Sequence, residues 1–177
     1  MRILYDTLLA DIDAVPTFVA LIDPDDPRFL APHDMSAAIN AYLQEKNQVP
    51  LQAPVAFIRC ILESLVLRYC EVFQQIYELT GNRITDVHVL GGGARNARLN
   101  QWLADALDLP VVAGPYEATA YGNALMQLVG LGELHTLQDV RVVAQGQPTS
   151  LFVPRAERRV AWSEAAQRFR SMINEVE

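Results

Sequence analysis

One stretch of the sequence decides the fold: Val89-Leu90-Gly91-Gly92-Gly93-Ala94-Arg95-Asn96. The apolar residues 87–90 before it are typical of a β-strand, and three consecutive glycines interrupt that strand. After it, apolar residues recur with the spacing of an amphipathic helix, at Leu99, Trp102, Leu103, Ala106 and Leu107. A strand, a glycine bend and a helix together predict the first half of a β-α-β unit.

The residues that follow complete this unit. Residues 110–113 predict a second strand, and a helix is expected from Glu117 to about residue 129. A strand, a crossover helix and a strand imply parallel pairing with a right-handed connection. Further segments predict a short helix at 137–144, an extended stretch at 151–154 and a closing helix at 156–175. Two clear strands and one weak strand make too small a sheet for five or six helices, so either strands are hidden in the helical segments or the chain belongs to something larger.

The N-terminal part predicts helices separated by a loop. Residues 3–14 suggest a short helix, and the prolines and aspartates of 21–29 predict an ordered loop. Its carboxylates favour turns and caps over a calcium site, because the usual glycine and distal glutamate are missing. Asp34 is expected to cap a helix over 35–47, and Pro54 to begin the longest helix, which ends at Gly81. Two apolar stripes on that helix predict burial on two sides.

Composition narrows the class of protein. The chain has 177 residues, of which 51% are hydrophobic and 20% charged, as expected for one globular domain or two small lobes. Its net charge of −7 argues against non-specific binding to nucleic acid or to an anionic membrane. The longest apolar stretch, residues 54–79, carries several charges and cannot span lipid. No secretory signal is visible, so we expect a cytoplasmic protein.

Reactive side chains give weaker signals. Cys60 and Cys70 lie ten positions apart on one helix, about 15 Å, so they cannot pair and are expected to be reduced and buried. The histidines have no metal-ligand spacing, and no pattern predicts a catalytic residue. The two tryptophans are expected in the core. The arginines at 155, 158 and 159 predict a solvated face, because glutamates lie nearby.

The glycine stretch allows two interpretations. Its glycines permit a tight turn and bare main chain, and the start of the next helix favours a phosphate or a polar ring edge. The dinucleotide fingerprint is disfavoured, because Asn96 occupies its last position and the next strand ends in Ala113-Gly114. A Walker-type loop is absent from the sequence. The glycines therefore either bind a ligand or only turn the chain. Small residues from Ala118 to Ala124 predict close helix packing around Gly122.

Four segments together resemble the C-terminal part of the FGGY carbohydrate kinases: 22–29, 59–65, 91–101 and 113–123. The Asp-Pro-Asp-Asp-Pro loop narrows this resemblance to the rhamnulokinase branch of the family. The resemblance implies an α/β fold, part of the C-terminal domain of the ribonuclease H-like, actin-like ATPases, with a small parallel β-α-β-α core flanked by helices. It divides the chain into a helical and loop insertion region (1–53), a nucleotide-side α/β core (54–154) and a closing helix (155–177).

The resemblance also implies a function. Gly91, Gly92, Gly93 and Asn96 would lie beside the adenine and ribose of ATP, which acts with Mg²⁺, and Gly122 would allow a close approach near a hinge. The substrate would be L-rhamnulose, phosphorylated on its 1-hydroxyl and held through an N-terminal domain that this chain lacks. The catalytic aspartate also lies upstream in the family, so the chain alone is expected to be inactive. The alternatives are a kinase of another ketose and a non-catalytic module that self-associates through surface exposed by truncation.

Overall fold

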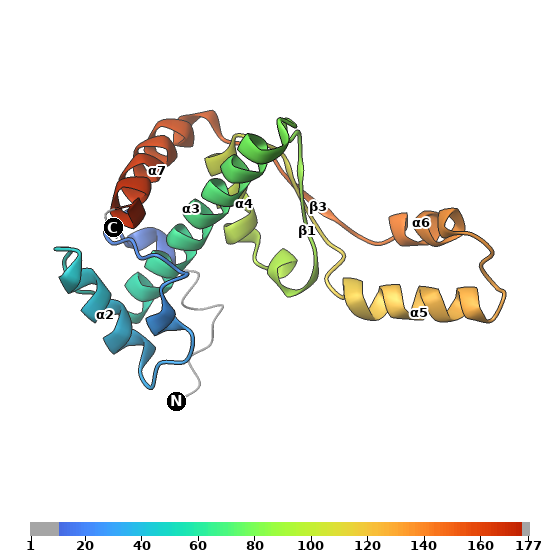
Figure 1. Cartoon of the computed structure of the whole chain (residues 1–177), viewed down its shortest axis with the longest axis horizontal. Coiled ribbons are helices and arrows are strands. Elements are labelled where there is room, and N and C mark those ends of the chain that lie inside the picture. Colours follow the sequence, from blue (N-terminus) through green and yellow to red (C-terminus); the bar gives the residue numbers. More distant parts are fainter. Residues whose placement is uncertain (1–10, 175–177) are drawn as a thin grey trace. The chain divides into compact units, whose positions relative to one another are not determined.

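The computed structural model describes residues 11–174, which form two compact units. The first unit contains residues 11–82 and 158–174, and the second contains residues 83–157. Figure 1 shows their elements. Residues 54–82 group with the N-terminal region, because the long helix that they form contacts the turn at 11–14 and the closing helix at 159–174. The predicted segments instead place them with the sheet. The predicted segments describe the family's layout and remain a prediction.

Among residues 11–174, three helices build the first unit: α2 (Met35–Glu45), α3 (Pro54–Thr80) and α7 (Arg159–Asn174). Three short 3-10 turns accompany them, η1 (Asp11–Ala14), η2 (Pro27–Phe29) and, at the junction of the two units, η4 (Ala156–Arg158). The helix signals are confirmed. The Asp34 carboxylate caps α2 by accepting from the Ala37 N–H at 3.0 Å, and α3 begins at Pro54. Gly81, with φ of 66°, ends α3 in the left-handed region. The predicted helix at 3–14 lies mostly outside the described residues.

The two halves of α3 differ in burial. Its first half is buried around residues 59–67. Its second half is exposed, including Val72 at 41% and Leu79 at 87%. The predicted burial on two sides is therefore wrong for this half. Helix length explains the difference, because the 27 residues of α3 span about 40 Å and the 16 residues of α7 span about 24 Å.

Buried polar side chains of α3 hold the preceding loop in place. The Arg59 guanidinium bonds the Glu63 carboxylate at 2.7 Å and donates to the Ile12 carbonyl at 2.6 Å. Glu63 also accepts from the Phe18 N–H at 2.8 Å, and the Ser64 hydroxyl accepts from the Ile22 N–H at 3.0 Å. These bonds satisfy polar groups that would be costly to bury alone.

The acidic loop, residues 22–29, confirms the turn-and-cap interpretation. Asp23 accepts from the Asp25 N–H at 3.1 Å, and Asp26 accepts from the Arg28 N–H at 2.9 Å as the cap of η2. Asp25 bonds Arg68 of α3 at 2.6 Å. All three carboxylates therefore serve the loop and its attachment to the first unit.

The second unit contains a three-stranded sheet. Its elements in order are β1 (Val87–Val89), η3 (Gly91–Arg95), α4 (Ala97–Leu107), β2 (Val111–Ala113), α5 (Ala118–Gly130), α6 (Leu137–Gln145) and β3 (Ser150–Phe152). The strand order is β1-β2-β3, with β1 parallel and β3 antiparallel to β2. The helix α4 packs against β2 and β3. The predicted β-α-β-α order and the parallel pairing are both confirmed.

The core prediction is confirmed for both tryptophans and for Cys60, but not fully for Cys70. Trp102 in α4 and Trp162 in α7 are buried, at 6% and 4% exposure. Both cysteines are free thiols, with Cys60 buried and Cys70 half-buried. Burial raises the pKa of each thiol to about 12, so neither is ionised at neutral pH. Over residues 11–174, no helix is both long and apolar enough to cross a membrane.

Candidate functional site

The residues Gly91–Arg95, called the glycine bend here, connect β1 to α4. Gly91 has φ of +73°, a conformation that residues with a side chain rarely adopt, so this position requires glycine. Backbone bonds attach the bend to the segment after β2. The Gly91 N–H donates to the Pro115 carbonyl at 3.1 Å, and the Gly114 N–H donates to the Val89 carbonyl at 2.9 Å. The main chain at the start of the bend is therefore fixed.

The outer side of the glycine bend is open. Gly92 and Gly93 are exposed, and a Cβ atom added at Gly92 would meet nothing within 4 Å. At Gly93 the added atom would make only an ordinary contact, 3.7 Å from Cγ1 of Val89. A ligand can thus approach the backbone at Gly92 without displacing a side chain. That Gly91, Gly92 and Gly93 contact a nucleotide remains a prediction.

Asn96, the residue after the bend, has a structural role. It is the N-cap of α4, and its side-chain oxygen accepts from the Leu99 N–H at 3.0 Å. The sequence comparison with kinases predicts that Asn96 contacts a nucleotide, and this too remains a prediction. Because capping uses this side-chain oxygen, replacing Asn96 would disturb the start of α4 as well as any ligand contact.

Arg95, the last residue of the bend, contacts Tyr116 and Glu117. The Arg95 guanidinium bonds Glu117 at 2.5 Å and lies 5.7 Å from the centre of the Tyr116 ring. The Arg95 side chain is 62% exposed. Flat guanidinium and phenol groups beside bare main chain can stack on an aromatic ring and offer hydrogen bonds to it. The sequence analysis did not assign these three residues to the site, because they belong to two segments that meet only in the fold.

Sequence reasoning also missed Asn100. This residue of α4 is 0% exposed, and its side-chain amide donates to the Ala94 carbonyl at 3.0 Å, under the glycine bend. A signal was present in the sequence. Asn100 precedes Leu103 and Leu107 by three and seven residues, which places it on their apolar face of the helix. A polar residue at a core position of an amphipathic helix indicates a specific buried partner.

One prediction about this unit is incomplete and another is wrong. Arg155 is exposed, as the solvated face predicts, but its guanidinium also bonds the buried Asp105 carboxylate at 2.6 Å. Close packing around Gly122 is also not observed, since a Cβ atom there would meet nothing within 4 Å of the described residues. The neighbouring Ala120 and Ala124 are exposed. Small residues in α5 therefore do not correspond to a tight contact in this structure.

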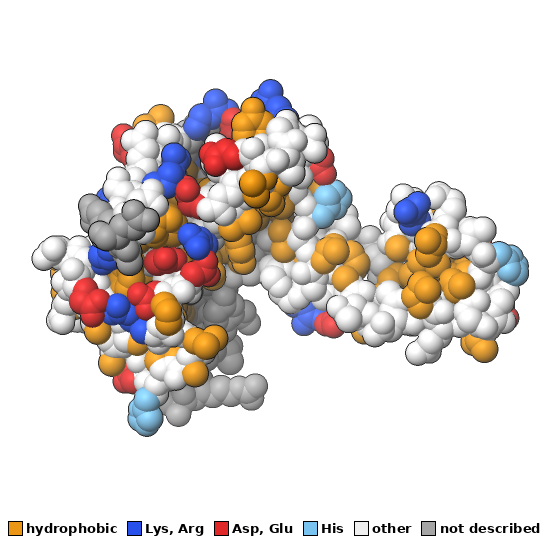
Figure 2. All heavy atoms as spheres, in the orientation of Figure 1, with side chains coloured by type: hydrophobic (Ala, Val, Ile, Leu, Met, Phe, Trp, Pro, Cys, Tyr) orange, Lys and Arg blue, Asp and Glu red, His pale blue; other side chains and the backbone are white. Residues whose placement is uncertain are grey.

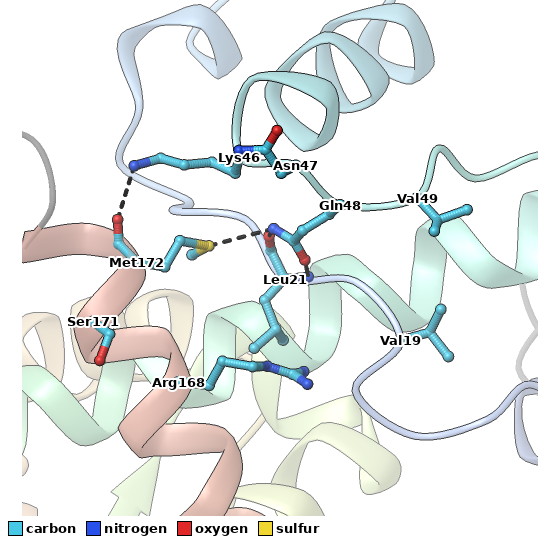
Figure 3. A pocket seen from close by; sticks show the side chains of 9 residues that line it. All are labelled: Val19, Leu21, Lys46, Asn47, Gln48, Val49, Arg168, Ser171 and Met172. Atoms are coloured by element: carbon cyan, nitrogen blue, oxygen red, sulfur yellow. Dashed lines mark hydrogen bonds between the residues drawn. The ribbon is translucent and has the colours of Figure 1, made fainter.

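A separate pocket of about 420 Å³ lies in the first unit, between the loop after α2 and α7 (Figure 3). Its two cations point away from each other in the close view. Lys46 donates to the Met172 carbonyl at 2.9 Å, and Arg168 donates to the Phe18 carbonyl. Both charges thus secure the backbone rather than converging on a shared ligand position, so the pocket is a weaker candidate site than the glycine bend.

Comparison with solved structures defines the class of protein. The chain is similar to a xyloylose (xylulose) kinase from Brucella ovis, with a TM-score of 0.55 and 22% identity, over 72% of this chain and 26% of the kinase. A xylulose kinase from Rhodospirillum rubrum matches with a TM-score of 0.53 and 20% identity, again over 72% of this chain and 26% of the kinase. The fold is that of sugar kinases of the actin/hexokinase-like ATPase class.

Sequence comparison then gives the family. Residues 5–131 match the profile of the FGGY family of carbohydrate kinases, C-terminal domain, and the chain belongs to this family. It is also 37% identical over 170 residues to a rhamnulokinase from Bacteroides thetaiotaomicron. That match covers 96% of this chain and 35% of the rhamnulokinase. The chain thus spans about a third of the length of this relative, and the sequence-based resemblance to the family is confirmed.

Proposed function

We propose that this chain is the nucleotide-contacting part of an ATP-dependent kinase that phosphorylates L-rhamnulose on its 1-hydroxyl, in the cytoplasm. The open main chain at Gly92 is the observation that carries the nucleotide assignment, because a side chain there would fill the space that a purine nucleoside needs. The family membership supports a sugar kinase. The identity of 37% to a rhamnulokinase supports rhamnulose over other ketoses.

We expect the described residues to contact only the adenosine part of ATP. Bare backbone at Gly92 and Gly93 can lie against the adenosine, with Arg95 and Tyr116 beside it. Within residues 11–174, no cluster of three or more His, Cys, Asp or Glu side chains could hold a metal ion. We therefore assign none of the described residues to Mg²⁺. The chain alone is expected to lack sugar phosphorylation, because phosphoryl transfer depends on aligned groups that both lobes supply.

Gly92→Val tests the nucleotide site. The new side chain enters open space, so the fold should tolerate it, while the approach of adenosine to the backbone is blocked. We expect the affinity for ATP to fall at least about tenfold, equivalent to about 1.4 kcal/mol. The measurement is a titration of isotope-labelled chain with ATP, followed by NMR at the amides of the glycine bend. This method detects the weak binding expected of an isolated part.

Gly130→Val is the matched control. Gly130 ends α5, and an added Cβ atom there also meets nothing within 4 Å. This variant should bind ATP as the unmodified chain does. Equal affinity of Gly92→Val and Gly130→Val, or no ATP-dependent shift of the bend amides in the unmodified chain, would overturn the assignment of the site.

A chimaera tests the activity. This chain would replace the matched third of the Bacteroides thetaiotaomicron rhamnulokinase, and phosphorylation of a panel of ketoses would be measured. We expect ATP-dependent phosphorylation of L-rhamnulose, and Gly92→Val in the chimaera should raise KM for ATP more than KM for the sugar. A folded chimaera that prefers another ketose would contradict the rhamnulose assignment, and one without activity would contradict the kinase assignment.

A second candidate function is self-association without catalysis. Large apolar side chains gather on α5 and α6, as the space-filling view shows in orange (Figure 2). Leu131 and Leu137 there are 76% and 63% exposed. Exposed apolar surface of this kind favours contact with another protein surface. Light scattering over a range of concentrations tests this candidate: a mass that stays at 19.7 kDa rejects it, and a concentration-dependent dimer supports it.

A further inference from the structure

The buried amide of Asn100 lies directly beneath the glycine bend. Its Nδ2 donates to the Ala94 carbonyl at 3.0 Å and, more weakly, to the Gly93 carbonyl at 3.5 Å. Its own backbone N–H donates to the Asn96 carbonyl at 3.1 Å, so the first turn of α4 fixes the position from which the side chain reaches. The side chain thus joins the helix to the second half of the bend.

This contact determines how the bend presents its main chain. A peptide unit is planar, so a carbonyl held toward Asn100 fixes the N–H of the following residue on the opposite side. Glycines have no side chain to restrain them and sample more backbone conformations than other residues. Both glycines are also exposed: a Cβ atom added at Gly92 would meet nothing within 4 Å, and one added at Gly93 would make only the ordinary contact with Val89. The Asn100 amide therefore supplies a restraint that packing does not supply.

The other end of the same amide is unsatisfied. Among the described residues, the Asn100 Oδ1 is the buried side-chain oxygen without a hydrogen-bond partner. Burying an acceptor without a partner opposes folding, whereas an apolar side chain of similar size would avoid that loss. Only the contacts of Nδ2 with the bend favour an amide over leucine here. A buried group that destabilises the folded state in this way is typical of a functional position.

We propose that Asn100 is a positioning residue that holds the glycine bend in the conformation that receives the nucleotide. It acts through the carbonyls of Gly93 and Ala94 and does not touch the ligand, since it is fully buried. This role rests on the proposed function of the bend. It predicts that stability and nucleotide affinity respond differently to the loss of the amide.

Asn40 provides a matched comparison within the same chain. Its Nδ2 donates to the Leu51 carbonyl at 2.9 Å, and its Oδ1 accepts from the Leu51 N–H at 2.8 Å. Both ends of this amide are used, and both serve the loop between α2 and α3. Asn40→Leu should therefore lower the Tm and leave the ATP affinity unchanged.

The experiment measures the Tm and the ATP affinity of Asn100→Leu, Asn100→Ala and Asn40→Leu, at a temperature where each variant is folded. We expect both Asn100 variants to bind ATP at least about fivefold more weakly, about 1 kcal/mol. We expect the Tm of Asn100→Leu to change little, because loss of the unsatisfied oxygen offsets loss of the donor to the Ala94 carbonyl. If Asn100→Leu does not fold, Asn100→Ala still tests the role of the amide.

Two outcomes separate this inference from the proposed function. If Gly92→Val weakens ATP binding and the Asn100 variants do not, the positioning role is wrong and the site stands. If Gly92→Val has no effect, the proposed function itself fails. A lowered Tm of Asn100→Leu with unchanged affinity would show a structural residue only and would overturn the inference.

Discussion

The acidic loop and the glycine bend are both tightly turned connections, the first rich in aspartate and proline and the second in glycine. They use their polar groups in opposite ways. In the acidic loop, side chains bond the loop's own backbone and α3, as Asp23, Asp25 and Asp26 show. In the glycine bend, the restraints lie underneath, at Asn100, while Gly92 is open outside. The difference teaches that a cluster of charges can be purely structural, whereas bare main chain held from below is available to a ligand.

The largest effect should come from the buried ion pair behind the acidic loop. Glu63→Gln removes the buried carboxylate charge that Arg59 bonds and weakens the bond to the Phe18 N–H. We expect unfolding free energy to fall by about 3–5 kcal/mol in urea titrations. The exposed Glu45 bonds Arg28, and Glu45→Gln should lower the unfolding free energy far less, because solvent screens this pair. Equal losses in the two variants would contradict the structural role of this region.

An effect of intermediate size on stability should distinguish Gly91 from Gly92. Gly91→Ala places a side chain at φ of +73° and should lower unfolding free energy by about 1–2 kcal/mol. Gly92→Ala places it in open space, without positive φ, and should leave stability nearly unchanged. Thermal unfolding of the two variants measures the difference. A Gly92→Ala variant as unstable as Gly91→Ala would show that the bend is closed.

The smallest effect concerns the cap within the acidic loop. Asp26→Ala removes the acceptor for the Arg28 N–H and should cost about 1 kcal/mol at pH 7, with unchanged ATP affinity. Burial tends to raise the pKa of Asp26, but the hydrogen bonds and charge of Arg28 outweigh it and hold the pKa below its ordinary value.

The sign of the pH dependence follows from that lowered pKa. Asp26 contributes stability above the pKa of the unfolded chain, about 3.9, and this contribution is lost as pH falls through the folded value. Urea titrations between pH 7 and pH 3 should show the gap between the unmodified chain and Asp26→Ala becoming smaller. A gap that grows toward acid pH would contradict the role of Arg28.

Local signals made much of the fold predictable. Asp34 and Pro54 mark helix starts by their own chemistry, and the spacing of apolar residues predicts α4 without knowledge of its partners. Contacts between distant residues were not predictable. The bond of the exposed Arg155 to Asp105 is an example, because Asp105 lies 50 residues earlier in the chain. The exposed second half of α3 carries the same apolar pattern as its buried first half, so sequence could not separate them.

The candidate site shows the same division. Its glycines are evident in the sequence, because three in succession between an apolar strand and an amphipathic helix indicate a bend of bare main chain. Their support is not evident, because Asn100 serves the bend through two carbonyl groups, and every residue has a carbonyl. The open surface at Gly92 also depends on what the fold leaves uncovered, which no local pattern specifies.

The placement of the two indoles gives each compact unit its own optical reporter. Trp102 belongs to the second unit and Trp162 to the first, both are buried, and the chain has no other tryptophan. Replacing either with phenylalanine leaves a single tryptophan, whose fluorescence emission shifts when unfolding exposes it to water. Two such proteins, melted side by side, reveal whether the units lose their structure in one cooperative step or one after the other.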